Sequence, residues 1–376
     1  MARHRGLGIS AIEYPTGMNQ NGDPSQAWLK MKPDGRVDLL TSTTDPGTGS
    51  RTVQTQIAAE ALGIPYDWIT HDNSSTDCSP YCTGTFASRA TFIAGNAVLK
   101  AALAARSKLL DVAGRELGAD PGELDVADGE VFVVADPERR LGVPDVAAAA
   151  VFTYGEMIAG TGAQGKPFTP ISDPETGAVE TAPHSAISYA ACAAEVEVDD
   201  VTGAVFVEHL WQCFDVGRAI NPAQVEGQIR GGATMGLGLA LLEACYPYYP
   251  SVEHRGSQVG SYLLPGLKNL PTIDTIVIEN SSDEGPYGAK GIGEMAGNPQ
   301  APAIAAAVYD AVGVWITELP ITPERVLRAL DRREHGPRLD GKWVIYDEDL
   351  SVDTLAHPSS RFRLSHGELG SGAHAY

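Results

Sequence analysis

The hydrophobic pattern of the first 120 residues predicts a hairpin and two helices. Residues 25–44 alternate polar and apolar side chains around the turn-forming Pro33-Asp34-Gly35, which predicts a β-hairpin. From 53 to 62 the apolar residues recur at helical spacing, and Gly63 ends that run. A longer helix is expected from 92 to about 117.

The second half of the chain repeats this order of elements. Two runs of β-forming residues, 188–198 and 204–214, precede a glycine-rich turn and a glycine-studded helix. Apolar helices are expected at 301–313 and 323–331. The pattern therefore predicts an α+β fold of two similar lobes, each with mixed β-sheets and packed helices.

Changes in composition suggest the domain boundaries. A segment rich in Gly, Pro and Thr separates the two halves, and the chain turns polar after residue 331. The expected parts are a first lobe at 1–155, a connector at 156–184, a second lobe at 185–335 and a polar C-terminal arm at 336–376.

One stretch in the connector, Gly160–Pro167, is close to a phosphate-binding P-loop. Pro167 stands where that motif needs a magnesium-binding hydroxyl, and the prolines that follow prevent the required helix. We expect no strand to run into this stretch and no nucleotide to bind there.

The charge balance excludes some classes of partner. The formal net charge is −21, so no basic stripe is available for nucleic acid or for an anionic membrane surface. No apolar run reaches the ~20 residues of a membrane-spanning helix, and the N-terminus lacks the apolar core of a secretory signal.

The five cysteines do not form a disulfide framework, because their number is odd and their spacing is wide. Cys78 and Cys82 lack the companions of a zinc or iron–sulfur site. We expect reduced thiols, a cytoplasmic protein and no side chain that ligates a metal.

Two small-residue loops precede the helices of the first lobe. Asp45–Ser50 gives the order strand, glycine-rich loop, helix, which directs backbone N–H groups at an anion. Thr83–Thr91, rich in hydroxyls, is a second candidate cradle. The alternative for the second loop is an ordinary helix N-cap.

A third glycine-rich stretch, Gly288–Glu294, ends in a carboxylate ahead of an apolar helix. Glycine lets a backbone approach a bound group closely, so this turn can hold Glu294 against a bulky ligand. The alternative is a solvated loop whose glutamate faces water.

Taken in order, four stretches resemble motifs of the molybdenum hydroxylases, the family of xanthine dehydrogenase and aldehyde oxidoreductase. DPGTGSRT resembles the family's G-Q-G loop, and TGTFASRATFIAGNAV resembles its serine-rich pterin loop. DVGRAINPAQVEG resembles a signature of the family with the same residue pattern, and GAKGIGE resembles the family's G-x-K-G-x-G-E motif. The resemblance covers residues from about 5 to 331.

The sequence departs from the family pattern in two ways. Thr48 replaces the glutamine of the G-Q-G loop, which changes the side chain offered to a pterin but leaves the backbone amides. The family's N-terminal half, with its F-G-G-G-F-G-G-K loop, is not in this sequence. The chain thus resembles the C-terminal half of a split molybdopterin-binding subunit, like the medium molybdopterin subunit of the nicotinate dehydrogenases.

The resemblance implies a cofactor and a set of partners. The cofactor is molybdenum with a pyranopterin, in the cytosine dinucleotide form. The implied partners are a complementary N-terminal-half molybdopterin subunit, a 2Fe-2S subunit and an FAD subunit. Iron–sulfur clusters and flavin would then lie on those chains.

The resemblance also implies roles for particular residues. Glu294 is expected to be the catalytic base. The expected cofactor-binding residues are Gly47, Thr48, Gly49, Ala87, Ser88, Gln224, Lys290 and Gly291. Lys290 has an alternative partner in Glu284, and Phe86 is expected either to face the substrate ring or to be a core aromatic.

The implied reaction is hydroxylation of an N-heteroaromatic, nicotinate-like substrate with water as the oxygen source. Electrons would leave through the iron–sulfur and flavin subunits. Alternatives are the same chemistry on a purine, an aldehyde or an aromatic CoA thioester. A non-catalytic scaffold or cofactor-insertion protein is the remaining alternative, which Glu294 disfavours because a carrier needs no base.

Overall fold

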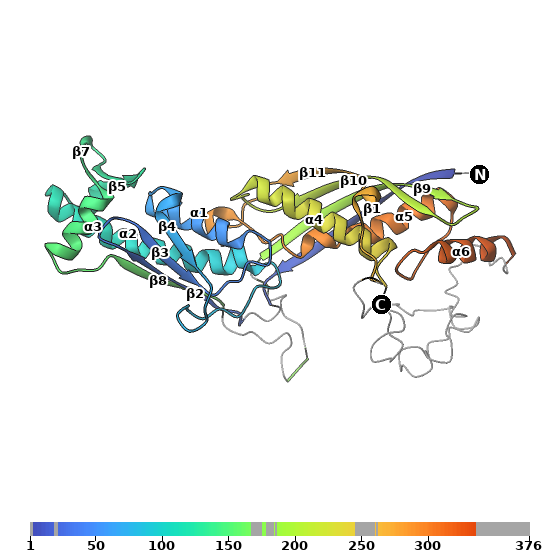
Figure 1. The fold of residues 1–376 in the computed structure, drawn as a ribbon, viewed down its shortest axis with the longest axis horizontal. Helices are drawn as coiled ribbons and strands as arrows, with labels where there is room; N and C mark the ends of the chain where they lie inside the picture. Colours follow the sequence, from blue (N-terminus) through green and yellow to red (C-terminus); the bar gives the residue numbers. More distant parts are fainter. Residues whose placement is uncertain are drawn as a thin grey trace. The chain divides into compact units, whose positions relative to one another are not determined.

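The computed structural model describes residues 3–18, 22–166, 175–177, 184, 186–244, 260 and 262–335 (Figure 1). The helices in this part are α1 Ser50–Leu62, α2 Gly95–Leu117, α3 Val143–Phe152, α4 Pro222–Leu241, α5 Gln300–Val312 and α6 Pro323–His335. The strands are β1 Arg3–Thr16, β2 Ser25–Met31, β3 Val37–Thr41, β4 Ile69–Asp72, β5 Leu124–Ala127, β6 Glu130–Val133, β7 Asp136–Gly142, β8 Ala159–Gln164, β9 Ala186–Asp199, β10 Val205–Asp215 and β11 Thr272–Ile278. The expected arm at 336–376, and most of the expected connector beyond residue 166, lie outside the described residues.

Several short helical turns complete this part of the chain. They are Tyr66–Trp68, the π-helical turn Ala90–Ala94, Pro121–Glu123, Leu267–Asn269, Pro286–Gly288 and Met295–Gly297. The π-helical turn leads directly into α2, where the sequence predicted an uninterrupted helix from 92. The mixture of sheets and packed helices confirms the predicted α+β class.

The sheet of the second lobe has the strand order β1-β9-β10-β11. β9 and β10 confirm the two β runs predicted from the sequence, and they pair antiparallel. β1 pairs antiparallel with β9 along its length, and β11 pairs parallel with β10. The sequence pattern assigned no element to β1. This strand lies at the N-terminus, whereas the other strands of the sheet come from the second half of the chain. The expected lobe boundaries at 155 and 185 stay a prediction.

The main sheet of the first lobe has the order β4-β3-β2-β8. The antiparallel pair of β2 and β3 confirms the predicted hairpin, and β5-β6-β7 form a separate small sheet. The expectation of no strand at the near-P-loop was wrong, because β8 occupies 159–164 and pairs with β2.

Glycine pairs let one strand of each four-stranded sheet touch a helix backbone. A Cβ placed on Gly160 or Gly162 of β8 would lie 2.0 Å from a carbonyl oxygen of α2. A Cβ on Gly6 or Gly8 of β1 would lie 2.1 Å from a carbonyl oxygen of α5. Contacts this short exclude any side chain, so these glycines serve close packing and not turns.

The lobes have separate hydrophobic cores. In the first, β2, β3 and β8 pack on α1 and α2. In the second, β9 and β10 pack on α4 and α5. A smaller cluster of buried residues supports the loop that carries Glu294; its members are Ala190, Phe214, Val216, Ile229, Met295 and Ala296.

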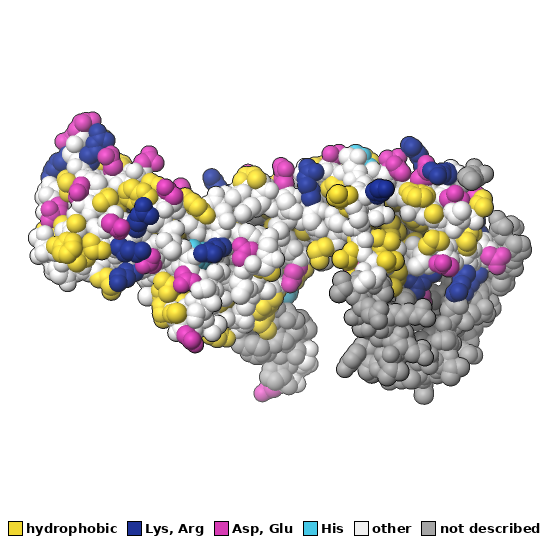
Figure 2. All heavy atoms as spheres, viewed as in Figure 1, with side chains coloured by type: hydrophobic (Ala, Val, Ile, Leu, Met, Phe, Trp, Pro, Cys, Tyr) yellow, Lys and Arg dark blue, Asp and Glu magenta, His cyan; other side chains and the backbone are white. Residues whose placement is uncertain are grey.

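Contacts divide the chain into the unit Met1–Leu330, which contains all three sheets, and the unit Asp331–Tyr376. The described part of the second unit is the last turn of α6. On the face shown in Figure 2, acidic, basic and apolar side chains are intermixed. None of the described helices is long and apolar enough to cross a membrane.

Candidate cofactor-binding site

Loops from three distant parts of the chain meet at one cavity within the first unit. They are the loop before α1, the loop before the π-helical turn, and the loop that ends at Glu294. The cavity has a volume of about 210 Å³, and Thr48, Phe86, Ser88 and Glu294 lie in its wall. A smaller cavity of about 50 Å³ shares Thr48 with it and adds Gln224 and Lys290. The structure therefore brings together most of the residues that the motifs singled out.

The backbone amides of the loop Asp45–Ser50 donate to a carboxylate of the same loop, that of Asp45. The backbone N–H groups of Gly47 and Gly49 donate to Asp45 Oδ1 at 3.0 Å, and that of Arg51 donates to Asp45 Oδ2 at 3.1 Å. Gly47 and Gly49 have φ values of 109° and 77°, which favour glycine. Asp45 thus already accepts from the amides of Gly47 and Gly49, and a cofactor contact of these two residues stays a prediction.

Two side-chain oxygens in this region are left without a hydrogen-bond partner. Thr48 Oγ1 and Gln224 Oε1 are buried, and neither is bonded to any described residue. Gly49 packs against Gln224 so closely that an added Cβ would lie 2.6 Å from the amide carbon of Gln224. Buried polar atoms are normally bonded, so these two fit a polar ligand such as a pterin.

The loop before the π-helical turn has an unusual backbone. Ala87 and Ser88 have φ values of 46° and 52°, a left-handed region in which residues other than glycine are uncommon. Such conformations persist where surrounding contacts enforce them, and they often occur at functional sites. One such contact is the Gly17 N–H, which donates to the Ala87 carbonyl at 2.8 Å.

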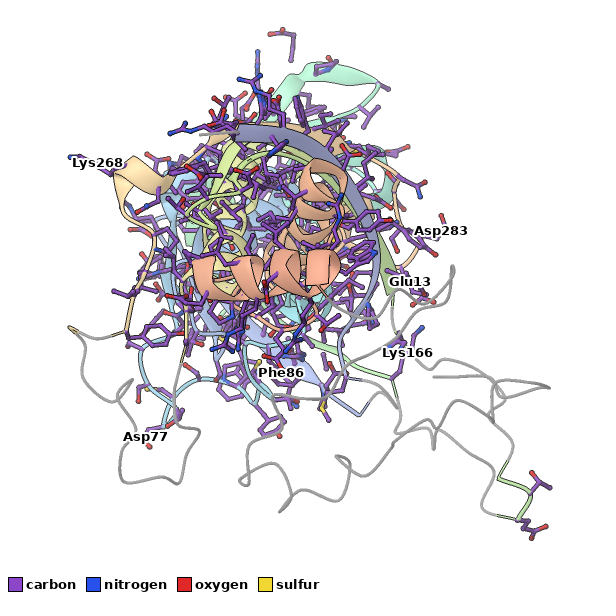
Figure 3. All side chains as sticks on the ribbon, turned by 90° about the vertical axis from the view of Figure 1, so that its right-hand side faces the viewer. Glu13, Asp77, Phe86, Lys166, Lys268 and Asp283 are labelled. Carbon is purple, nitrogen blue, oxygen red and sulfur yellow. The ribbon has the colours of Figure 1, made fainter. Side chains whose placement is uncertain are left out.

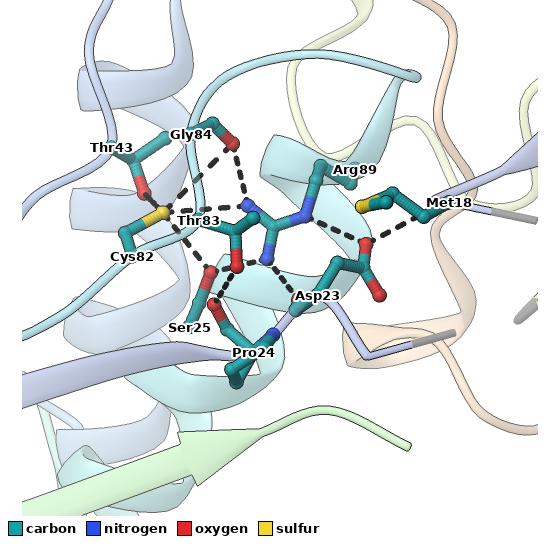
Figure 4. A network of polar contacts seen from close by, with 9 residues as sticks. All are labelled: Met18, Asp23, Pro24, Ser25, Thr43, Cys82, Thr83, Gly84 and Arg89. Atoms are coloured by element: carbon teal, nitrogen blue, oxygen red, sulfur yellow. Dashed lines mark hydrogen bonds and ion pairs between the residues drawn. The ribbon is translucent and has the colours of Figure 1, made fainter. Parts of the chain in front are cut away.

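Arg89, the next residue, anchors this loop from inside the protein (Figure 4). Its side chain is fully buried. The guanidinium donates to Asp23 Oδ2 at 2.9 Å, to the Gly84 carbonyl at 2.6 Å and to Ser25 Oγ at 2.7 Å. The sequence motifs did not indicate a role for Arg89. Its signal is a lone cation within a run of small and apolar residues ahead of a helix.

Arg89 also contacts the thiol of Cys82, at 3.4 Å from its Nη1. Burial alone would raise the pKa of this thiol. Hydrogen bonds from Ser25 and Arg89, with the guanidinium charge, outweigh burial and hold the pKa of Cys82 below its ordinary value. The network is thus strongly polar although it lies largely inside the protein.

Phe86, labelled in Figure 3, lies in the wall of the larger cavity and is half-buried. The guanidinium carbon of Arg89 lies 5.5 Å from its ring centroid, within cation–π range. Of the two interpretations of Phe86, the cavity position matches a residue that faces a ligand better than a fully buried core aromatic.

Glu294 lies at the exposed end of the glycine-rich loop, at the edge of the larger cavity. Its backbone N–H donates to Ser88 Oγ at 3.0 Å. Gly291 packs against Ser88, because an added Cβ would lie 1.9 Å from the Ser88 carbonyl oxygen. The Tyr14 hydroxyl donates to Glu294 Oε2. Burial raises the pKa of Tyr14 far above its ordinary value, and the hydrogen bond to Glu294 raises that pKa further.

Lys290 is buried and forms an ion pair with Asp215, with 2.7 Å between Nζ and Oδ2. The alternative partner considered for it, Glu284, instead forms an ion pair with Lys166, a residue labelled in Figure 3. Pairing of Lys290 with Glu284 is therefore wrong. Asp215 was not predicted to act here, although it opens the DVGRAINP motif. A role of Lys290 at a cofactor phosphate stays a prediction.

Comparison with known proteins agrees with this geometry. Residues 1–271 match the family described as "Molybdopterin cofactor-binding domain". The nicotine 6-hydroxylase large subunit of Paenarthrobacter nicotinovorans is 35% identical over 87% of this chain and 40% of its own length. The xanthine dehydrogenase molybdenum-binding subunit of Escherichia coli O157:H7 is 30% identical over 86% of this chain and 41% of its own length.

Solved structures show the same fold. Quinoline 2-oxidoreductase from Pseudomonas putida 86 matches with a TM-score of 0.77 at 30% identity, over 88% of this chain and 42% of that one. The chain thus spans about 40% of the length of these relatives. It belongs to the molybdopterin cofactor-binding family, as a molybdopterin-binding part of the molybdenum hydroxylases.

Proposed function

We propose that this chain is the molybdopterin-binding subunit of a complex that hydroxylates an N-heteroaromatic compound of the nicotinate type with water as the oxygen source. The observation that carries the proposal is the Glu294 carboxylate at the edge of a cavity with Phe86 in its wall. Two relatives support the substrate class, because their names specify the N-heterocycles nicotine and quinoline.

The residues around the cavity suit a bound pyranopterin. Thr48 and Gln224 offer the unpaired oxygens, and the Ala87-Ser88 turn offers a backbone fixed by Arg89. When bound, the molybdenum–pterin group supplies the two-electron oxidation that adds a water-derived oxygen to the substrate. The cytosine dinucleotide form of that group is part of the proposal.

In this scheme Glu294 takes a proton at one carboxylate oxygen during the reaction. General-base assistance of this kind contributes typically about 10²–10⁴-fold to a rate. The Ser88 hydroxyl fixes the backbone of Glu294, and the aromatic ring of Phe86 offers a flat surface on which an electron-poor heterocycle can stack.

The rest of the complex is also proposed. A complementary N-terminal-half subunit would complete the cavity, and 2Fe-2S and FAD subunits would carry the electrons away, in the cytoplasm. Large apolar side chains on the surface, among them Met235, Leu264 and Leu267, are suited to contact with another chain. We propose that the scaffold divides near the expected boundaries at 155 and 185, with β8 completing the sheet of the first half and β1 that of the second.

Two further substrate classes have specific support. Relatives include a xanthine dehydrogenase subunit and, among solved structures, an aldehyde oxidoreductase from Desulfovibrio gigas at 27% identity with a TM-score of 0.71. Purines and aldehydes therefore belong in any substrate screen, together with an aromatic CoA thioester.

The test is a comparison of wild type, Glu294→Gln and Glu284→Gln in the purified complex at matched molybdenum content. Each protein is mixed anaerobically with nicotinate, quinoline, hypoxanthine or benzaldehyde, and cluster and flavin reduction is followed. Glu294→Gln keeps the shape of the side chain but cannot take the proton, so we expect a loss of about 10²–10⁴-fold. Glu284→Gln is the control, since that exposed residue lies just ahead of the Pro286–Gly288 turn that leads into the loop.

The outcomes separate the alternatives. Reduction by an N-heterocycle, with ¹⁸O from labelled water in the product, supports the proposal. A Glu294→Gln protein that reacts at a rate near that of wild type would show that Glu294 is only a loop carboxylate. Release of the molybdenum cofactor on dialysis, with no reduction by any compound, would favour a scaffold or insertion protein.

A further inference from the structure

Tyr14 of β1 and Ser188, the residue paired with it on β9, both form hydrogen bonds to the loop that carries Glu294. Tyr14 lies near the end of β1, directly opposite Ser188 of β9. Ser188 is fully buried and donates to the Gly291 carbonyl at 3.2 Å. Tyr14 donates to the carboxylate of Glu294, three residues further along the same loop. The pair thus fixes this loop at its middle and at its C-terminal end.

The hydrogen bond from Tyr14 makes the two carboxylate oxygens of Glu294 unequal. Oε2 accepts from the Tyr14 hydroxyl, while Oε1 has no hydrogen-bond partner among the described residues. The Ser88 hydroxyl also accepts from the Glu294 backbone N–H at 3.0 Å. A carboxylate held at its backbone and at one oxygen has few rotamers left, so its second oxygen keeps one direction.

We propose that Tyr14 is a positioning residue that holds Glu294 Oε2, so that Oε1 is the oxygen directed at the reactant. This inference rests on the proposed function, because it gives Glu294 a proton to take. Tyr14 stays neutral through the working pH range, since burial and its bond to Glu294 raise its pKa. It therefore remains a donor to Oε2 and does not compete for the proton.

The alternative is that Tyr14 only packs. Its ring contacts the cluster of buried residues beneath the loop, which a phenyl ring would contact equally well. Tyr14→Phe separates the two roles, because it keeps the ring and removes only the hydroxyl.

The kinetic test uses the assembled, molybdenum-loaded complex with Tyr14→Phe, Glu294→Gln and the double variant. Tyr189→Phe is the matched control, an exposed tyrosine on the neighbouring strand β9. We expect Tyr14→Phe to slow anaerobic single-turnover reduction about 10- to 100-fold, because a small misplacement of a reacting group costs on this scale. Substrate affinity and molybdenum content should stay unchanged. In the Glu294→Gln background, Tyr14→Phe should cause no further loss.

A second readout needs no cofactor. In the complex prepared without molybdenum, the melting temperatures of the four proteins form a double-mutant cycle. A direct bond from Tyr14 to the Glu294 carboxylate predicts a coupling of about 2–4 °C. Tyr189→Phe should show no coupling to Glu294→Gln.

The possible results distinguish this inference from the function on which it rests. A slow Tyr14→Phe protein whose effect disappears in Glu294→Gln supports positioning. Equal losses in both backgrounds, or a normal rate despite the thermal coupling, would overturn it while leaving Glu294 as the base. A fully active Glu294→Gln protein would overturn both proposals.

Discussion

The two loops that precede helices in the first lobe achieve left-handed backbone by different means. In Asp45–Ser50 the positive φ values fall on Gly47 and Gly49, and the adjacent Asp45 accepts the loop amides. In Gly84–Arg89 positive φ values fall on Gly84 and also on Ala87 and Ser88. The strain there is balanced by Arg89, which is bound to residues more than sixty positions away.

The difference shows which loop is locally determined. The hydrogen bonds from the loop amides to Asp45 all span six residues or fewer, so short-range chemistry is enough to shape Asp45–Ser50. The other loop needs Asp23 and Ser25, which are in place only after the first lobe has folded. We therefore expect its geometry to depend on long-range packing, and the largest effects of mutation to fall on that packing.

The largest expected effect is that of Arg89→Ala. Removing one partner of a buried ion pair leaves Asp23 uncompensated, which typically costs about 3–5 kcal/mol of unfolding free energy. Arg106→Ala is the control, since Arg106 pairs with Asp125 at the surface and such pairs are worth about 0–1 kcal/mol. Chemical denaturation of the two variants measures the difference. Equal stabilities would show that the second loop does not depend on Arg89.

The same contrast explains what the sequence could predict. The hairpin at 25–44, the helix over 53–62 and the paired strands β9 and β10 follow from periodicity and turn residues, and the structure confirms them. β8 was missed because Gly160 and Gly162 were interpreted as turn residues. In the structure they allow contact with the α2 backbone, which no local pattern reveals.

The residues of the candidate site also fall into those that motifs predict and those that only the fold reveals. Motifs located Thr48, Ser88 and Glu294, which the structure places around one cavity. They did not indicate Tyr14, since β1 reaches the second lobe only by pairing with β9. The partner of Lys290 was also beyond local reasoning, because Asp215 lies 75 residues away. Residues that support the site from other elements need the fold before they can be named.

An intermediate effect is expected when alanine replaces a glycine of positive φ in the loop Asp45–Ser50. Gly49→Ala places a Cβ in a left-handed backbone, at a cost of about 1–2 kcal/mol, and pushes the Gln224 amide away. Gly47→Ala is the control, because its Cβ would meet nothing within 4 Å. We expect both variants to lose stability but only Gly49→Ala to lose molybdenum, measured per subunit in the purified complex. Equal molybdenum content would show that Gln224 does not hold the cofactor.

The smallest effect should have the opposite sign. Ala87→Gly removes a Cβ from a backbone with a φ of 46°, which relieves about 1–2 kcal/mol of strain. Part of that gain is lost, because glycine makes the unfolded chain more flexible, at about 0.4–1 kcal/mol. A net stabilisation of roughly half a kcal/mol is expected from these two terms. Ala104→Gly, within α2, is the matched control and should destabilise by about 1 kcal/mol. The measurement is chemical denaturation of both variants. If Ala87→Gly destabilises as much as Ala104→Gly, the turn is not strained and the contrast between the two loops fails. If it stabilises the protein but slows turnover, the strain in the second loop is part of how Ser88 is held against Glu294.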